Sequence, residues 1–62
     1  MRQATHKDFT PGTYLYDSEG NEFIIRDQYE VGIFNVDVYS GTRHVGKKVL
    51  FSCEAQFYKV KT

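Results

Sequence analysis

Ile33-Phe34-Asn35-Val36-Asp37-Val38-Tyr39 is the longest regular alternation of apolar and polar side chains in this chain. On an extended backbone, Phe34, Val36 and Val38 lie on one side, and Asn35 and Asp37 lie on the other. Such alternation, rich in β-branched and aromatic residues, is typical of a half-buried antiparallel strand. We therefore predict a central strand over residues 33–39, with Phe34, Val36 and Val38 in the core.

Turn signals on both sides of this strand predict two hairpins. Asp17-Ser18-Glu19-Gly20 has the residues of a type I turn followed by a left-handed glycine, which would join strands over 12–17 and 21–28. Ser40-Gly41 would join the central strand to a partner over 43–52. Within that partner, Gly46 predicts a bulge or bend. A polar loop is expected over residues 28–32.

The two ends of the chain are less regular. Ser52 is expected to cap one helical turn over residues 52–55, before a last short strand over 57–61. Residues 1–11 form a polar arm in which Thr5 and Asp8 have capping-box spacing, so one helical turn ending before Pro11 is expected. A disordered arm is the alternative. The predicted organisation is an arm over 1–11 and one β domain over 12–62.

Five short strands with one helical turn before the last are the layout of an SH3-like barrel, and residues 51–61 resemble the closing stretch of that fold. Pro11-Gly12-x-Tyr14, with Gly20 and Phe23, also resembles a family of small bacterial domains of unknown function that opens P-G-x-Y-x-H-x-x-G-x-x-Y and closes near an aromatic-x-x-V. Tyr16 stands in place of the family's histidine, and its H-S-E-T and W-x-R-P motifs are missing. The resemblance covers residues 11–60. It implies an all-β, five-stranded SH3-like barrel and no activity.

The length and composition indicate one small intracellular domain. Sixty-two residues provide one core, to which five Phe and five Tyr contribute most of the bulk. Cys53 is the only cysteine, which excludes an internal disulfide and favours a reducing cytoplasm. No apolar run reaches the length of a membrane span, and the N-terminus lacks the apolar core of an export signal. We expect a cytoplasmic protein.

The residues that usually carry catalysis or bind metals are few. His6, His44 and Cys53 show no zinc-ligand spacing, and the chain has no glycine-rich phosphate loop. A catalytic pair of His44 and Cys53 is the alternative, but a free cysteine usually behaves as a small buried apolar residue. We expect no enzyme activity, no cofactor and no metal.

The charges are separated along the chain although the net charge is zero. Residues 8–42 carry seven acids against Arg26 alone, and residues 43–62 carry five Lys and Arg against Glu54 alone. The basic stretch contains Arg43, His44, Lys47 and Lys48, which could follow phosphates while Tyr29 and Tyr39 stack on bases. The pI of 6.7 is low for such a domain, since nucleic-acid-binding domains usually exceed about 9.

Five tyrosines are too many for a core this small to bury with satisfied hydroxyls, so some must be exposed. Tyrosine dominates the energetics of many protein interfaces. We therefore predict a protein-binding module that uses Tyr29, Tyr39, Arg43, His44, Lys47 and Lys48, with a nucleic-acid-binding β-barrel as the alternative. A chain this short, without a catalytic domain, is typical of phage or mobile-element accessory proteins that inhibit a host factor.

Overall fold

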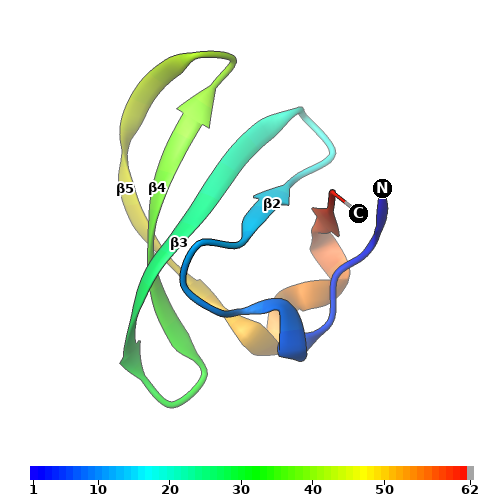
Figure 1. Cartoon of the computed structure of the whole chain (residues 1–62), viewed down its shortest axis with the longest axis vertical. Helices are drawn as coiled ribbons and strands as arrows, with labels where there is room; N and C mark the ends of the chain where they lie inside the picture. The colour runs from blue at the N-terminus through cyan, green and yellow to red at the C-terminus, as the bar shows by residue number, and fades with distance from the viewer. Residues whose placement is uncertain (62) are drawn as a thin grey trace.

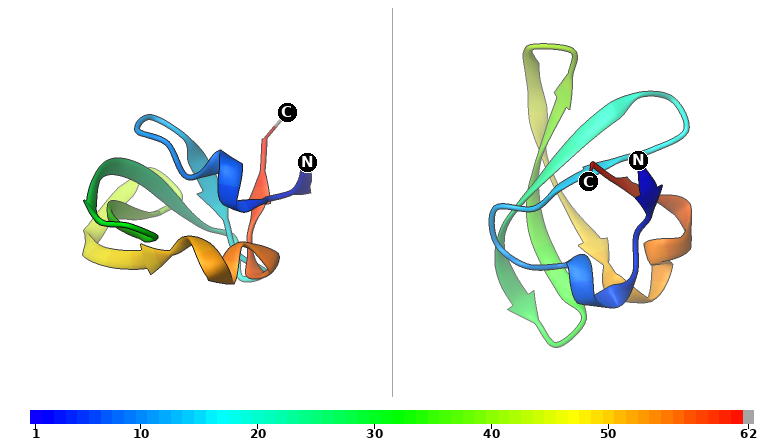
Figure 2. Two further views of the ribbon diagram at one scale, coloured as in Figure 1. Left: turned by 90° about the horizontal axis from the view of Figure 1, so that it is seen from below. Right: turned by 45° about the vertical axis from the view of Figure 1, so that its right-hand side comes forward.

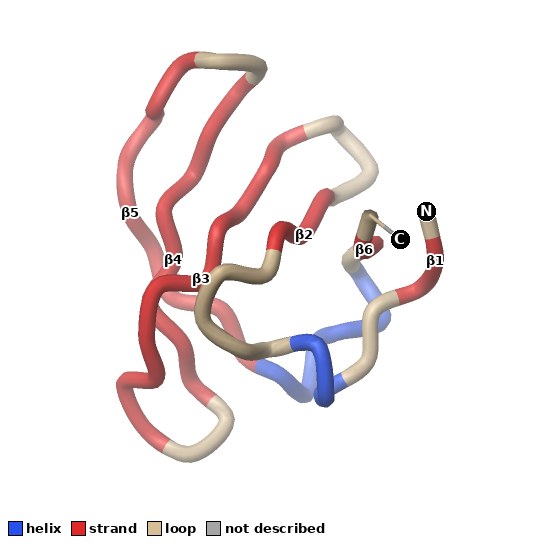
Figure 3. The backbone as a smooth tube through the Cα atoms, in the orientation of Figure 1, coloured by secondary structure: helices blue, strands red, loops and turns tan. Residues whose placement is uncertain are grey.

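The computed structural model describes residues 1–61, which form a single antiparallel sheet (Figure 1). Its strands lie in the order β1-β6-β2-β3-β4-β5, so the prediction of an all-β chain is confirmed. Two short 3-10 helices, η1 and η2, lie next to each other at one end of the sheet (Figure 3). The elements are β1 Arg2–Gln3, η1 His6–Asp8, β2 Tyr14–Tyr16, β3 Asn21–Glu30, β4 Ile33–Ser40, β5 Arg43–Phe51, η2 Ser52–Phe57 and β6 Lys59–Val60.

The predicted closed barrel of five strands is wrong in two respects. Residues 1–61 contain a sixth strand, β1, which pairs with β6 at one edge of the sheet. At the other edge β5 pairs with β4 and with no further strand of residues 1–61 (Figures 1 and 2). The two edge strands, β1 and β5, are not paired with each other. The sheet curls around its core but stays open.

The central meander follows the predicted pattern, with shifted boundaries. The strand predicted over residues 33–39 is β4, and its neighbours in the sheet are β3 and β5. The polar loop expected over residues 28–32 is shorter than predicted, because β3 continues to Glu30 and only Val31 and Gly32 form the turn. On β5 the bulge expected near Gly46 is confirmed: Gly46 pairs with Val38, and the register then skips Val45.

The first hairpin closes as its turn residues predict. Gly20 has φ +85°, a left-handed conformation in which a side chain would be strained. The Asp17 carboxylate accepts hydrogen bonds from the backbone N–H groups of Glu19 and Asn21, both at 2.9 Å. The Asn21 side chain donates a third bond to Asp17 at 3.0 Å. This turn therefore has its own local hydrogen-bond network.

The core lies on the concave side of the curled sheet. Phe34 and Val36 are buried as predicted, but Val38 is only partly buried and packs at the margin. On β5 the buried residue is Leu50, and its neighbours Val49 and Phe51 are exposed. The remaining core residues come from β2, β3, β6 and the two ends of the chain: Ala4, Phe9, Leu15, Phe23, Ile25, Ala55 and Val60.

The first nine residues contribute to this core. Ala4 and Phe9 are both buried, and the Phe9 ring lies 5.6 Å from the Phe34 ring between centroids. The Gln3 side chain donates hydrogen bonds to the carbonyl oxygens of Ala55 at 3.0 Å and Tyr58 at 2.9 Å. The start of the chain thus closes one end of the sheet together with η2.

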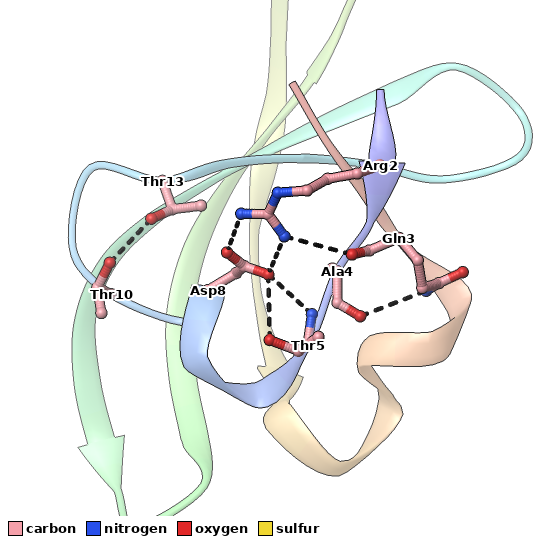
Figure 4. Close-up of polar contacts among 7 residues, drawn as sticks. All are labelled: Arg2, Gln3, Ala4, Thr5, Asp8, Thr10 and Thr13. Atoms are coloured by element: carbon pink, nitrogen blue, oxygen red, sulfur yellow. Dashed lines mark hydrogen bonds and ion pairs between the residues drawn. The ribbon is translucent and has the colours of Figure 1, made fainter. Parts of the chain in front are cut away.

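Polar contacts within this N-terminal segment fix its conformation (Figure 4). The predicted capping box is present, since the Thr5 backbone N–H donates to Asp8 Oδ2 at 2.8 Å. Arg2 donates two hydrogen bonds to the same carboxylate, at 2.6 and 2.9 Å. The predicted cap of the second turn is wrong: Ser52 is the first residue of η2, and Phe51 holds the cap position without a side-chain hydrogen bond.

Candidate functional site

Two rows of side chains cross the sheet on the face opposite the core. Residues directly opposed on neighbouring strands project to the same side of a sheet. Leu15, Phe23 and Val36 point into the core, so the residues next to each of them along its own strand point outward. One row is Tyr14, Ile24, Asp37 and Lys47, and the next is Tyr16, Glu22, Tyr39 and His44. We call these eight residues, together with Arg26, the outer-face cluster.

Asp37 lies at the centre of the outer-face cluster. It is the only buried charged side chain within residues 1–61, at 7% exposure. The Arg26 Nε–H donates a hydrogen bond to Asp37 Oδ2, and His44 Nε2 lies 3.3 Å from Oδ1. The Arg26 guanidinium holds the pKa of Asp37 below its usual value, against the opposing effect of burial, and His44 adds to the lowering. Both carboxylate oxygens of Asp37 are thus occupied.

Two of the cluster's three tyrosines contact polar side chains of neighbouring strands. The Tyr16 hydroxyl donates to Glu22 Oε2 at 2.6 Å, and this hydrogen bond raises the pKa of Tyr16. The Tyr39 ring meets the His44 ring edge-on, with centroids 5.1 Å apart. Tyr14 is exposed. The cluster therefore combines aromatic surface with polar groups already held in position.

The structure brings together three of the six residues predicted from the sequence to bind a partner. Tyr39, His44 and Lys47 belong to the outer-face cluster. Lys48 pairs with the buried Val36 and lies on the core side, where its Nζ atom is 5.7 Å from the centre of the Phe23 ring. The predicted basic stretch is therefore divided between two faces of β5.

The other two predicted residues, Arg43 and Tyr29, are not part of the cluster. Arg43 pairs with Ser40 at the end of the β4–β5 hairpin. Tyr29 is exposed near the opposite end of the sheet, beside the β3–β4 turn. Ile33, at that end of β4, and Tyr39 are six residue steps apart, a span of about 20 Å at the usual rise per residue.

Sequence reasoning missed the cluster residues on β2 and β3: Tyr14, Tyr16, Glu22, Ile24 and Arg26. A signal was present, because Tyr14 and Tyr16 share one face of a strand whose middle residue, Leu15, is fully buried. The sequence also placed Asp37 on the polar side of the predicted central strand, which was a second signal. Only the pairing of the strands shows that these residues are neighbours.

A shallow groove of about 690 Å³ adjoins the cluster at β2. Tyr14, Tyr16 and Glu22 line it together with Arg2, Asp8 and Lys61. The Arg2 and Asp8 side chains are paired with each other (Figure 4). The groove extends the tyrosine-lined surface toward the N-terminal segment.

His44 and Cys53, the residues considered above as a catalytic pair, lie on different elements, β5 and η2. Within residues 1–61 no three His, Cys, Asp or Glu residues are grouped closely enough to hold an ion. Cys53 is exposed in η2, so it fills no gap in the core, and the His44 ring contacts Asp37 and Tyr39. The helices found in residues 1–61 are too short to cross a membrane.

Comparison of the chain with models of protein families, with curated proteins and with solved structures finds no significant match to any of them.

Proposed function

We propose that this chain is a non-catalytic binding domain that recognises a protein partner through the outer-face cluster. The observation that carries this proposal is the gathering of Tyr14, Tyr16, Tyr39 and Arg26 on one open face of the sheet. Tyrosine and arginine are enriched among the residues that dominate the energy of protein interfaces. Because internal hydrogen bonds already hold Tyr16 and Arg26, binding costs less side-chain entropy.

Nucleic-acid binding is the alternative, and the placement of the cations favours it less. Binding of a nucleic-acid backbone requires cationic side chains that follow the phosphates along one face of the protein. Lys47 points to the outer face, however, whereas Lys48 lies on the core side. Within the outer-face cluster the two acids Asp37 and Glu22 balance Arg26 and Lys47. Such a mixed surface suits a protein partner better than a polyanion.

The strand order supports a relationship to SH3-like folds as part of this proposal. Strands β2 to β5 form a meander, and after η2 the chain returns to pair β6 with β2. The single cysteine is in keeping with the cytoplasm as its location. By analogy with other small chains that lack a catalytic domain, we propose that it is a phage or mobile-element accessory protein that inhibits a host factor.

Affinity capture from a lysate of the host tests the binding function. Wild-type protein is compared with Tyr39→Ala and Tyr14→Ala, with and without nuclease. We expect one protein in stoichiometric amount, insensitive to nuclease. Measured with that protein, Tyr39→Ala should raise Kd by about 30-fold or more, the effect of an energetically dominant interface tyrosine.

Tyr29→Ala is the matched control, because Tyr29 is an exposed tyrosine outside the cluster. It should leave Kd unchanged. Recovery that disappears with nuclease, together with a Kd that rises steeply with salt, would show nucleic-acid binding instead. An unchanged Kd for Tyr39→Ala, together with a loss of affinity for Tyr29→Ala, would place the interface away from the outer-face cluster.

A further inference from the structure

The exposed edge of β5 continues the outer-face cluster. Strand β5 has nine residues, Arg43–Phe51, and pairs on one side only, with β4 (Figure 1). Beyond the bulge at Val45, residues 46–51 run in uninterrupted register with β4. An unpaired strand edge presents N–H and C=O groups that can bind another extended chain.

All the charged side chains of this edge strand are basic. Strand β5 carries Arg43, Lys47 and Lys48 and no acidic residue. Lys47 lies opposite Asp37, but Arg26 and His44 occupy the oxygens of that carboxylate. Within residues 1–61, neither Lys47 nor Lys48 forms an ion pair. Both ammonium groups are therefore available to an acidic partner.

A second copy of this chain does not suit the edge. In an antiparallel pairing of two β5 strands centred on Lys47, the two Lys47 side chains would lie directly opposite each other. Like charges in that position destabilise a sheet, and lysine on edge strands is a known protection against self-association. The same charges attract an acidic strand, so the edge discriminates between partners by charge.

We propose that β5 accepts an extended, acidic segment of the protein partner as an additional antiparallel strand. This inference rests on the proposed function, because it specifies the chemistry of that partner. Opposite Lys47 and Lys48 the added strand would carry two consecutive acids, one on each face of the sheet. Opposite Val49 and Phe51, which are exposed on the outer face, it would carry apolar residues. Read from its N-terminus, the segment would be apolar-x-apolar-acid-acid.

The probe that tests this is a capped peptide, Thr-Val-Thr-Val-Glu-Glu-Thr-Thr, titrated into the whole chain at low salt and followed by the backbone NMR signals of the protein. We expect shifts and slowed amide exchange confined to β5 and the adjoining outer face. The same peptide with both Glu replaced by Lys should bind at least about tenfold more weakly, because like charges repel.

Backbone methylation of the peptide separates edge pairing from simple charge attraction. In a paired strand, alternate N–H groups face the neighbouring strand, and the others face away. We expect N-methylation of one alternating set to abolish binding and methylation of the other set to leave it intact. Equal effects of the two sets, or absence of binding at low salt, would overturn the proposal.

Two variants that each remove one positive charge test whether the acidic peptide binds at β5. Lys47→Gln should weaken binding of the acidic peptide by about threefold to tenfold, as expected for loss of one interfacial charge contact. Lys7→Gln, which removes an exposed lysine of η1, should not change it. If both variants bind alike, the peptide is not at β5. Suppose that a protein partner is captured and that its binding depends on Tyr39, but that the peptide tests fail. The proposal of strand addition at β5 would then be wrong, and the proposed binding function would be unaffected.

Discussion

Among single residues, Asp37 of the outer-face cluster makes the stability of the fold depend on pH. Because Arg26 and then His44 favour the ionised form, the folded state lowers the pKa of Asp37, although burial opposes this. A lowered pKa stabilises the fold above the unfolded value of about 3.9, and this stabilisation is lost as the pH falls through the folded value. Asp37→Asn should therefore lower the free energy of unfolding at pH 6, and its difference from wild type should shrink toward pH 2.

Denaturant unfolding at a series of pH values measures this difference. Glu30→Gln is a suitable control, because Glu30 is exposed and forms no ion pair within residues 1–61. It should follow the wild-type curve closely. A constant deficit of Asp37→Asn at every pH would mean that the carboxylate charge contributes nothing to stability.

Among the elements, the β2–β3 hairpin depends most clearly on its turn. Gly20 has φ +85°, where a β-branched side chain is strained although no other atom would obstruct its Cβ. Gly20→Val should lower the free energy of unfolding by about 1–3 kcal/mol, the usual cost of such a conformation. Thermal or denaturant unfolding gives the value.

Ser18→Ala provides the comparison within the same turn. Ser18 is exposed, and the hydrogen bonds that hold the turn come from the Asp17 carboxylate and the Asn21 side chain. Its substitution should change stability by no more than about 0.5 kcal/mol. Similar losses for both variants would show that the hairpin is not limited by the conformation of Gly20.

For the whole molecule, the N-terminal segment is part of the folding unit. Phe9 is buried against Phe34, and Ala4 lies in the same core. Phe9→Ala should lower the free energy of unfolding by about 3–5 kcal/mol, the range measured for buried phenylalanine. That is a large part of the stability of a small domain. Denaturant unfolding, followed by tyrosine fluorescence, provides the measurement.

The matched control for this effect is Phe57→Ala, since the Phe57 side chain is exposed. Its loss should change stability by about 0.5 kcal/mol or less. If Phe9→Ala were as harmless, the first nine residues would lie on the domain without supporting it, as a separate arm.

Of the outer-face cluster, the sequence predicted Tyr39, His44 and Lys47. The other members could not be predicted, because their proximity depends on strand register. Tyr14, Asp37 and Lys47 are far apart in sequence and become neighbours only through three strand pairings. The bulge at Val45 places His44, rather than Val45, opposite Tyr39. A one-residue shift in pairing would move every later side chain to the other face. Lys48 and Lys47 lie on opposite sides for a simpler reason, because successive side chains of a strand alternate between its two faces.

The sequence alone determined the features that depend on neighbours a few residues apart. The alternation over residues 33–39 predicted β4 and the burial of Phe34 and Val36, and the residues 17–20 predicted the first turn. The tertiary structure decided whether the sheet closes, which residues of different strands become neighbours on the outer face, and whether Ala4 and Phe9 enter the core. These features have no local signal, because they depend on pairing and packing between segments distant in sequence.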